Sequence, residues 1–292
     1  MVNTFTFRQI INDIATLCKW RVVSLMLITA FIGMLLTPSY LWHTNKILTG
    51  ISGIGLCALS GGVLNQVFES TIDQQMKRTK NRPLVTQTLS HNFAYSFAFL
   101  LFISGSIILY YCNNALSAAL TISTMFGYSF IYTKWLKPRT SQNIVIGGIF
   151  GAMPPLLGWS ALSNNIHLFP VLLVAIIFTW TPSHFWALSL ARVEDYKQSP
   201  LPMLPITHGV SATQVHILGY GILLTLITQL PYLLYYTSSS YLIFVNILNI
   251  WYLKHLYAVY QTPKPYHSFK AFKASNIYLL LLFVTLLMDK AL

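Results

Sequence analysis

Charged side chains are scarce in this sequence. Asp, Glu, Lys and Arg make up only 8% of its 292 residues, whereas 55% are hydrophobic and the mean hydropathy is +0.59. Soluble domains carry about 25% charged residues, because a protein of this size still needs a polar exterior. The scarcity of charge therefore excludes an ordinary soluble domain and predicts an all-α, polytopic membrane protein.

Cysteine is also rare. Cys18, Cys57 and Cys112 show no Cys-x-x-Cys spacing, which argues against a disulfide framework and against a cysteine zinc site. The N-terminal residues include Asp13 and lack a short hydrophobic core followed by a small-residue cleavage site. We therefore expect no cleaved signal or transit peptide, and a location in a bacterial inner (cytoplasmic) membrane.

Nine apolar stretches are long enough to cross a bilayer, which takes roughly 17 to 25 residues. We expect them to form a nine-helix bundle in a single membrane-embedded domain, residues 1–292. Residues 1–21 precede the first stretch and predict an amphipathic helix on the membrane surface, with Phe5, Ile10, Ile14 and Leu17 on one side. The predicted spans are 22–42, 47–65, 93–112, 115–133, 143–162, 168–190, 213–235, 239–260 and 274–289.

Basic residues fall mostly on one side of this predicted bundle. Fifteen of the eighteen Lys and Arg lie in the N-terminal segment or in the loops after the second, fourth, sixth and eighth spans. Lys46 and Lys290 lie on the opposite side, and Lys254 lies within the eighth span. The positive-inside rule then predicts a cytoplasmic N-terminus and a C-terminus outside. The fifteen are Arg8, Lys19, Arg21, Lys77, Arg78, Lys80, Arg82, Lys134, Lys137, Arg139, Arg192, Lys197, Lys264, Lys270 and Lys273.

Acidic residues are rarer still, and two of the six follow the second span one helical turn apart. Asn65, Glu69 and Asp73 are spaced i, i+4, i+8, so three oxygen-bearing side chains point toward one side of a helix. Such ligands suit Mg²⁺, which takes one or two carboxylates together with substrate phosphates. We interpret the pattern as a metal–diphosphate site, with a salt-bridged helix end as the alternative. Lys77, Arg78 and Arg82 follow at once and would hold phosphate oxygens. Further along the chain, Lys134, Lys137 and Arg139 would add positive charge to the same face.

A second charged cluster ends the sixth span, and it contains two more of the acids. Because both acidic span ends face the same compartment, we expect a shared site between them. A loop with three prolines follows, which is too rigid for a simple linker. The residues of this cluster are Arg192, Glu194, Asp195, Tyr196 and Lys197.

Three motifs resemble those of the UbiA superfamily of intramembrane prenyltransferases. They are NQVFESTIDQQMKRTKNRPL, residues 65–84, YTKWLKPRTSQNIVIGG, residues 132–148, and TPSHFWALSLARVEDYKQSPLPMLPITHG, residues 181–209. Within the superfamily the pattern is most similar to the heme O synthases, or protoheme IX farnesyltransferases, over roughly residues 10–290. Pro138 departs from it, because a second basic residue is usual there.

The resemblance implies a reaction and a set of ligands. Mg²⁺ held by Asn65, Glu69 and Asp73 would bind farnesyl diphosphate, and the departing diphosphate would be neutralised by Lys77, Arg78, Arg82, Lys137 and Arg139. Glu194 and Asp195 would either help to bind a second metal ion, with Asp195 as its ligand, or position Lys and Arg side chains. Heme B would be the acceptor and heme O the product, with a heme A synthase or the assembly of a terminal oxidase as possible partners. The aromatic faces that would stabilise an allylic cation are those of Phe68, Tyr128, Tyr132 and Trp186.

Two of the eight histidines, His184 and His208, lie within the third motif. We consider them, with Arg192, Glu194, Asp195 and Tyr196, as candidate contacts of heme. The remaining histidines have no motif around them, and we expect them to be packing residues: His43, His91, His167, His216, His255 and His267.

Three other functions fit parts of the pattern. The first is a UbiA-type enzyme with an aromatic or quinone-precursor acceptor. The second is a cation-coupled transporter with Glu69 and Asp73 as ion ligands, although transporters usually place such groups near the membrane midplane. The third is a non-catalytic heme-handling protein, which would not need a metal–diphosphate site.

Overall fold

The computed structural model describes residues 7–291, and this part of the chain is a bundle of long helices without strands. The elements are α1 (Phe7–Leu17), α2 (Trp20–Leu35), η1 (Ser39–Leu41), α3 (Thr44–Asp73), α4 (His91–Ile108), η2 (Leu109–Asn113), α5 (Ala115–Phe126), η3 (Gly127–Leu136), α6 (Asn143–Ala152), α7 (Pro154–Ser163), α8 (Leu168–Ala191), α9 (Val193–Lys197), α10 (Leu204–Thr207), α11 (Gly209–Ile227), α12 (Leu230–Leu233), α13 (Ser239–Gln261) and α14 (Pro265–Ala291).

The predicted all-α membrane fold is confirmed. Among the described residues, eight helical segments are long and apolar enough to cross a membrane, and the pair α1 and α2, bent by 57°, makes a possible ninth. The first predicted span, 22–42, was too long at its C-terminal end, because α2 stops at Leu35 and Pro38 then begins a 3₁₀ turn. The fifth span is broken into α6 and α7 at Met153, where Pro154 starts the second half.

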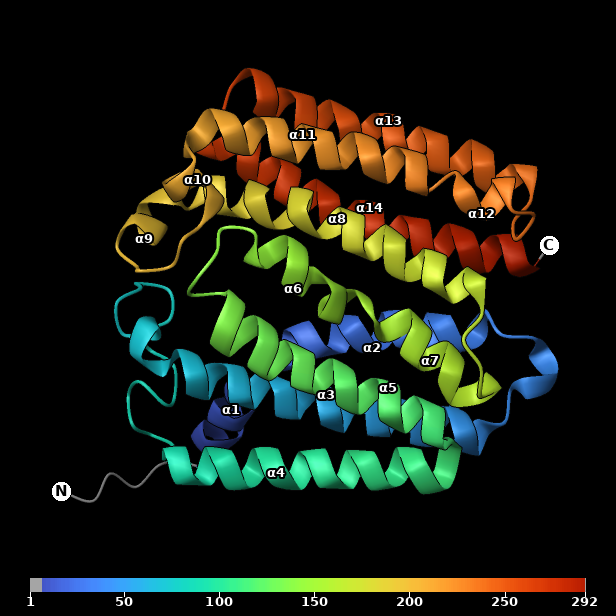
Figure 1. The fold of residues 1–292 in the computed structure, drawn as a ribbon, viewed down its shortest axis with the longest axis horizontal. Helices are drawn as coiled ribbons and strands as arrows, with labels where there is room; N and C mark the ends of the chain where they lie inside the picture. The colour runs from blue at the N-terminus through green and yellow to red at the C-terminus, as the bar shows by residue number, and fades with distance from the viewer. Residues whose placement is uncertain (1–6, 292) are drawn as a thin grey trace.

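Helix α1 lies at an angle to the bundle at the end where the chain begins (Figure 1). It is strongly amphipathic, as predicted for a surface helix. Leu17 is fully buried, Ile14 is partly buried and Ile10 is 41% exposed, so the apolar side faces α3 mainly through its last turn. Phe5, which we placed on the same side, lies outside the described residues.

The charged loops gather at one end of the bundle. The connections after α3, η3, α8 and α13 all lie at the end where α1 lies, and the C-terminus lies at the other (Figure 1). This is the arrangement on which the topology prediction depends. The assignment of that end to the cytoplasm stays a prediction.

Glycine residues let α2 and α7 approach each other closely. A Cβ atom on Gly33 of α2 would lie 2.1 Å from Pro155 O, and a Cβ atom on Gly158 of α7 would lie 1.9 Å from Ala30 O. Backbone therefore meets backbone where α2 crosses α7, as is usual for helices packed in a membrane. The larger apolar core lies in the other half of the molecule, where α8 packs against α11 and α14.

Candidate functional site

Helix α3 does not end with its apolar stretch at residue 65 but continues for two more turns to Asp73. These turns carry Asn65, Glu69 and Asp73, all of which are buried. Asn65 Nδ2 donates a hydrogen bond to Glu69 Oε1 at 2.8 Å, as their spacing along one helix face predicts. The two carboxylates thus lie inside the loop-rich end of the bundle.

The segment after α3 folds back over the acidic side chains. Arg82 Nη1 lies 2.6 Å from Asp73 Oδ2 and 3.9 Å from Glu69 Oε2. Thr79 Oγ1 donates to the backbone carbonyl of Asp73 at 2.9 Å, which closes the turn after the helix. The Arg-Thr-x-x-Arg part of the first motif therefore returns one guanidinium to the carboxylates.

A widened helical segment, η3, supplies the opposite wall. Lys137 follows it and donates a hydrogen bond from Nζ to Glu69 Oε1. Thr133 Oγ1 accepts from Asn65 Nδ2 at 2.9 Å and donates to Tyr128 O at 2.8 Å. Burial opposes the charge of Lys137, but the Glu69 carboxylate outweighs this and raises the pKa of Lys137.

Gly147, the first glycine of the pair that ends the second motif, makes room for this wall. A Cβ atom on Gly147 of α6 would lie 2.0 Å from the ring of Tyr132. Tyr132 stacks on Tyr128, with ring centroids 5.5 Å apart, and the Lys137 ammonium lies 6.0 Å from the Tyr132 centroid. Two aromatic faces therefore border the charged cluster.

Lys19 is a residue of this cluster that sequence reasoning missed. It lies between α1 and α2 with a left-handed backbone, φ 52°, and its Nζ donates to Asn65 Oδ1. We had interpreted it only as a topology determinant, since its position in the sequence is typical of one. Burial lowers the pKa of Lys19 to about 7, against the attraction of Glu69.

The bend between α1 and α2 is hydrogen-bonded to α3 beside the cluster. Gln66 Nε2 donates to Thr16 O at 2.6 Å and to Leu17 O at 3.2 Å. A Cβ atom on Gly62 would lie 2.7 Å from Cys18 O, so only glycine permits this approach. Gln66 directly follows Asn65, and this pair was the one sequence signal that could have pointed to a third chain segment at the site.

Together these residues form a polar cluster, whose charge suits an anion. Its members are Lys19, Asn65, Glu69, Asp73, Arg82 and Lys137. Three basic side chains surround two carboxylates, which leaves one net positive charge when all are ionised. Two carboxylates and an amide oxygen fit Mg²⁺, provided that phosphate oxygens complete its shell. In the described part of the chain, no group of three or more His, Cys, Asp and Glu could hold a metal on its own.

Three other basic residues predicted for the site are exposed. Lys77 and Arg78 lie on the surface of the segment after α3. Arg139 is also exposed and donates to the backbone carbonyl of Trp135 at 3.0 Å. None of the three makes an ion pair among the described residues, and their role toward phosphate stays a prediction.

The second charged cluster is at the same end of the bundle, on α9 (Figure 1). Glu194 is exposed and pairs with Lys197 at 2.8 Å, one turn away. Arg192, Asp195 and Tyr196 are half-buried, and the structure as described gives their side chains no hydrogen bond or ion pair. The shared site between the two clusters, and Asp195 as a metal ligand, therefore stay predictions.

The histidines and Trp186 of the third motif lie apart from the polar cluster. His184 is buried between α8 and α14, where its Nδ1 lies 2.6 Å from Ser275 Oγ. His208 is exposed at the start of α11. Trp186 packs against α11, so it is not one of the aromatic faces that border the charged cluster.

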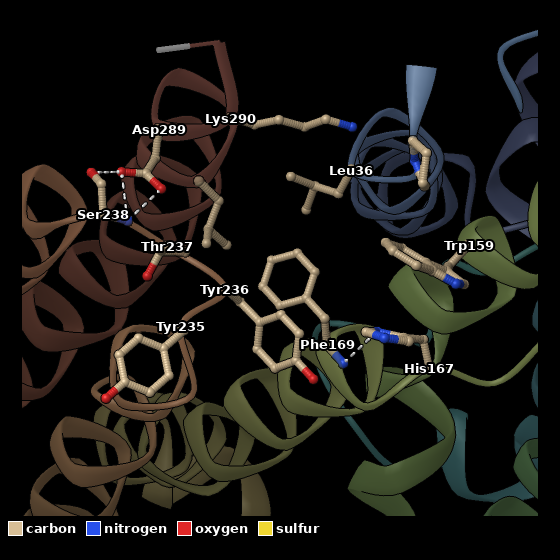
Figure 2. A pocket seen from close by; sticks show the side chains of 12 residues that line it. Leu36, Trp159, His167, Phe169, Tyr235, Tyr236, Thr237, Ser238, Asp289 and Lys290 are labelled. Atoms are coloured by element: carbon tan, nitrogen blue, oxygen red, sulfur yellow. Dashed lines mark hydrogen bonds between the residues drawn. The ribbon is translucent and has the colours of Figure 1, made fainter. Parts of the chain in front are cut away.

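A cavity of about 580 Å³ opens at the opposite end of the bundle, near the C-terminus (Figure 2). Its charged groups already have protein partners: Lys290 Nζ donates to Leu35 O at 2.7 Å, and Asp289 Oδ2 accepts from Ser238 N at 3.0 Å. These contacts tie helix ends together. The cavity has no pair of carboxylates and no set of free cations, so it does not suit a metal-bound diphosphate.

The profile of the UbiA prenyltransferase family matches residues 26–283. The chain belongs to the UbiA prenyltransferase family. It is 46% identical over 279 residues to protoheme IX farnesyltransferase 2 of Pseudoalteromonas atlantica, covering 95% of this chain and 91% of that protein. It is 43% identical over 278 residues to protoheme IX farnesyltransferase of Legionella pneumophila, covering 95% of each.

Solved structures share the fold of this chain. One is a structure described as concerning digeranylgeranylglyceryl phosphate synthase in membranes. It superposes with a TM-score of 0.80 at 19% identity, and the match covers 96% of this chain and 98% of that one. A UbiA homologue from Archaeoglobus fulgidus bound to DMAPP and Mg²⁺ superposes with a TM-score of 0.69 at 12% identity, covering 94% and 99%. The family profile and the curated relatives confirm the resemblance to the UbiA superfamily seen in the motifs.

Proposed function

We propose that the chain transfers a farnesyl group from farnesyl diphosphate to a vinyl group of heme B, with addition of water, to give heme O and diphosphate. The observation that carries this proposal is the polar cluster, where Arg82 and Lys137 pair with two buried carboxylates and Lys19 donates to the adjoining Asn65. The names of the relatives, protoheme IX farnesyltransferases at 42–46% identity, support heme as the acceptor.

In this proposal Arg82, Lys137 and Lys19 bind the oxygens of the diphosphate. Each already lies against Asp73, Glu69 or Asn65, so a small displacement exchanges a side-chain oxygen for a phosphate oxygen. Asn65, Glu69 and Asp73 would hold Mg²⁺, which neutralises charge on the leaving diphosphate. A UbiA homologue has been solved with DMAPP and Mg²⁺, which supports the assignment.

The reaction needs no nucleophile from the enzyme. The bond between the first farnesyl carbon and its oxygen breaks, and its electron pair leaves with the diphosphate, where the cations stabilise it. A heme vinyl group then forms a carbon–carbon bond to the allylic cation. Water adds to the resulting heme-side cation and loses a proton, which gives the hydroxyl group.

The stacked rings of Tyr128 and Tyr132 are suited to the cationic stage. Their faces border the cluster, and a π face attracts a nearby cation. Lys137 lies 6.0 Å from the Tyr132 centroid, so this ring face already borders a cationic group. Their tyrosine hydroxyls are not required as acids in this scheme.

We place the site on the cytoplasmic side of a bacterial inner membrane. The basic loops share one end of the bundle with the polar cluster (Figure 1), and loops rich in Lys and Arg are retained in the cytoplasm. A cation-coupled transporter is less consistent with this site, because a cluster with net positive charge repels a free cation.

The test uses purified protein in nanodiscs with heme B, farnesyl diphosphate and Mg²⁺, and follows heme O by mass spectrometry. We expect product from the native chain and from Lys46→Gln, whose side chain lies at the other end, and little from Asp73→Asn. Binding of farnesyl diphosphate without heme O would mean another acceptor. Binding of neither substrate would rule out prenyl transfer.

A further inference from the structure

Gln66, which follows Asn65 on α3, has no part in the proposed reaction, yet it is only 2% exposed. Its Nε2 donates to two successive backbone carbonyls, Thr16 O at 2.6 Å and Leu17 O at 3.2 Å. Its Oε1 is also buried and accepts no hydrogen bond from the described residues. A buried oxygen without a donor costs free energy. Packing alone would therefore favour an apolar side chain here, and what the amide contributes is its pair of donors.

The two carbonyls that this amide holds belong to the α1–α2 elbow, residues 16–19, where the chain turns from α1 into α2. Lys19 completes the turn: its backbone N–H donates to Thr16 O at 3.0 Å, and its φ of 52° is left-handed. A lysine adopts this strained conformation only where the surrounding structure fixes it. Gln66 and the Lys19 N–H share the Thr16 carbonyl, so the amide bonds directly to the turn that Lys19 closes.

Gly62 lies one helical turn before Gln66 and borders the same elbow. A Cβ atom on Gly62 would lie 2.7 Å from Cys18 O and 3.6 Å from Lys19 Cβ. Residues four apart share one face of a helix, whereas the next residue along is turned by about 100°. Helix α3 therefore holds the elbow backbone with Gly62 and Gln66, and receives the Lys19 ammonium with Asn65.

We propose that Gln66 is a positioning residue of the diphosphate site and that it acts through Lys19. The proposal rests on the proposed function, in which the Lys19 ammonium binds a diphosphate oxygen. While the Thr16 and Leu17 carbonyls are held, the left-handed turn directs the lysine side chain toward Asn65 Oδ1. Once they are released, the turn can relax to an ordinary backbone conformation, which moves the ammonium away from the polar cluster.

Apolar contacts hold the elbow against α3 independently of this amide. Leu17 is fully buried, Cys18 is 5% exposed, and both belong to a core cluster with Val63 and Val67 of α3. These contacts remain when the two hydrogen bonds are removed. Removing the amide should therefore change the position of Lys19 more than it changes the stability of the chain.

The test is the affinity for farnesyl diphosphate, measured by calorimetry on the full chain in nanodiscs with Mg²⁺ and without heme. Gln66→Met keeps the length of the side chain and removes its donors. We expect it to weaken binding by about tenfold, and by no more than Lys19→Ala does. Gly62→Ala displaces the elbow without changing Gln66 and should give a similar loss. In the Lys19→Ala background, Gln66→Met should cause no further loss, because the group that it positions is absent.

Gln214→Met is the matched control. Gln214 is buried on α11, and its Nε2 also donates to two successive carbonyls, Val259 O at 2.8 Å and Tyr260 O at 2.6 Å on α13. The variant loses the same pair of hydrogen bonds in the half of the molecule away from α3 (Figure 1). It should therefore bind farnesyl diphosphate with native affinity.

A second measurement follows Lys19 itself. Acetylation of lysines, read by mass spectrometry, should modify Lys19 more slowly than the exposed Lys46 in the native chain, because the Lys19 ammonium is hydrogen-bonded to Asn65. Gln66→Met should speed the modification of Lys19 and leave that of Lys46 unchanged. This readout needs no substrate, and a role of Gln66 in stability alone would not change it in the folded chain.

Native affinity in both Gln66→Met and Gly62→Ala would overturn the proposal, and so would losses that add up when Gln66→Met is combined with Lys19→Ala. Native protection of Lys19 in Gln66→Met would overturn the positioning step even if the affinity fell. The proposed function fails separately. A native chain that binds farnesyl diphosphate without forming heme O would reject heme as the acceptor and leave the role of Gln66 to the affinities. A native chain that does not bind farnesyl diphosphate would reject both.

Discussion

The guanidinium of Arg82 lies 2.6 Å from the carboxylate of Asp73, although the two residues are nine positions apart on different segments. The pair is largely buried, with 16% and 4% of the side chains exposed. It joins the last residue of α3 to the segment that folds back over the helix end. The contact therefore serves both the fold and the site.

We predict that Arg82→Ala destabilises the protein more than Arg82→Ala combined with Asp73→Ala. Removing only the guanidinium leaves a buried carboxylate without its partner, which costs about 3–5 kcal/mol. Removing both groups avoids that unpaired charge. Thermal unfolding in detergent measures the difference, and a double mutant that is as unstable as the sum of the singles would contradict the coupling.

Lys19 gives a second prediction, on substrate affinity. Lys19→Ala should weaken binding of farnesyl diphosphate by about 10- to 100-fold, because a charge-assisted hydrogen bond is worth about 1.5–3 kcal/mol. Lys19→Arg keeps the charge and should lose much less. Lys46→Ala removes a lysine from the other end and should bind normally. Equal affinity in Lys19→Ala and the native chain would remove Lys19 from the site.

The apolar runs were sufficient to predict the membrane bundle, because each long helix must hide its backbone polar groups from lipid. The residues at which helices end were harder to predict from the sequence. The α3 helix continues to Asp73 because Asn65, Glu69 and Arg82 satisfy one another's polar groups there, and a hydropathy pattern registers only their polarity. The early stop of α2 at Leu35 has the opposite cause, a proline shortly beyond the helix.

Spacing along one helix was sufficient to predict that Asn65 and Glu69 point to the same side, where they form a hydrogen bond, and the charge pattern pointed to Arg82 and Lys137. It did not point to Lys19, whose place depends on a left-handed elbow and on the close approach of Cys18 to Gly62. Contacts between segments that are distant in the sequence produce no regular residue spacing from which they could be predicted. Lys77 and Arg78 show the same difficulty. The sequence alone does not distinguish these exposed basic residues from Arg82, which the folded loop places against Asp73.

Removal of Mg²⁺ gives a third prediction. Chelation by EDTA should abolish heme O formation and weaken binding of farnesyl diphosphate, and added Mg²⁺ should restore both. Glu69→Gln should lower activity by about 10²–10³-fold and raise the Mg²⁺ concentration needed, because it removes one of two carboxylates. Glu69→Asp is the charge-matched comparison. Full activity after chelation would show that the cations of the cluster act without a metal ion.

The crossing of α2 and α7 gives the last prediction, on folding alone. Gly33→Ala and Gly158→Ala each place a methyl group about 2 Å from a backbone carbonyl of the other helix, at Pro155 and Ala30. Backbone cannot rotate away as a side chain does, so the helices must separate, and overpacking of this kind costs about 1–3 kcal/mol or more. Gly151→Ala is the matched control, because its new methyl group meets nothing within 4 Å and alanine favours a helix by about 1 kcal/mol. Thermal unfolding should therefore shift down for the first two variants and stay level or rise for the third, and a native melting temperature in Gly158→Ala would mean that the two helices do not pack as closely as the structure places them.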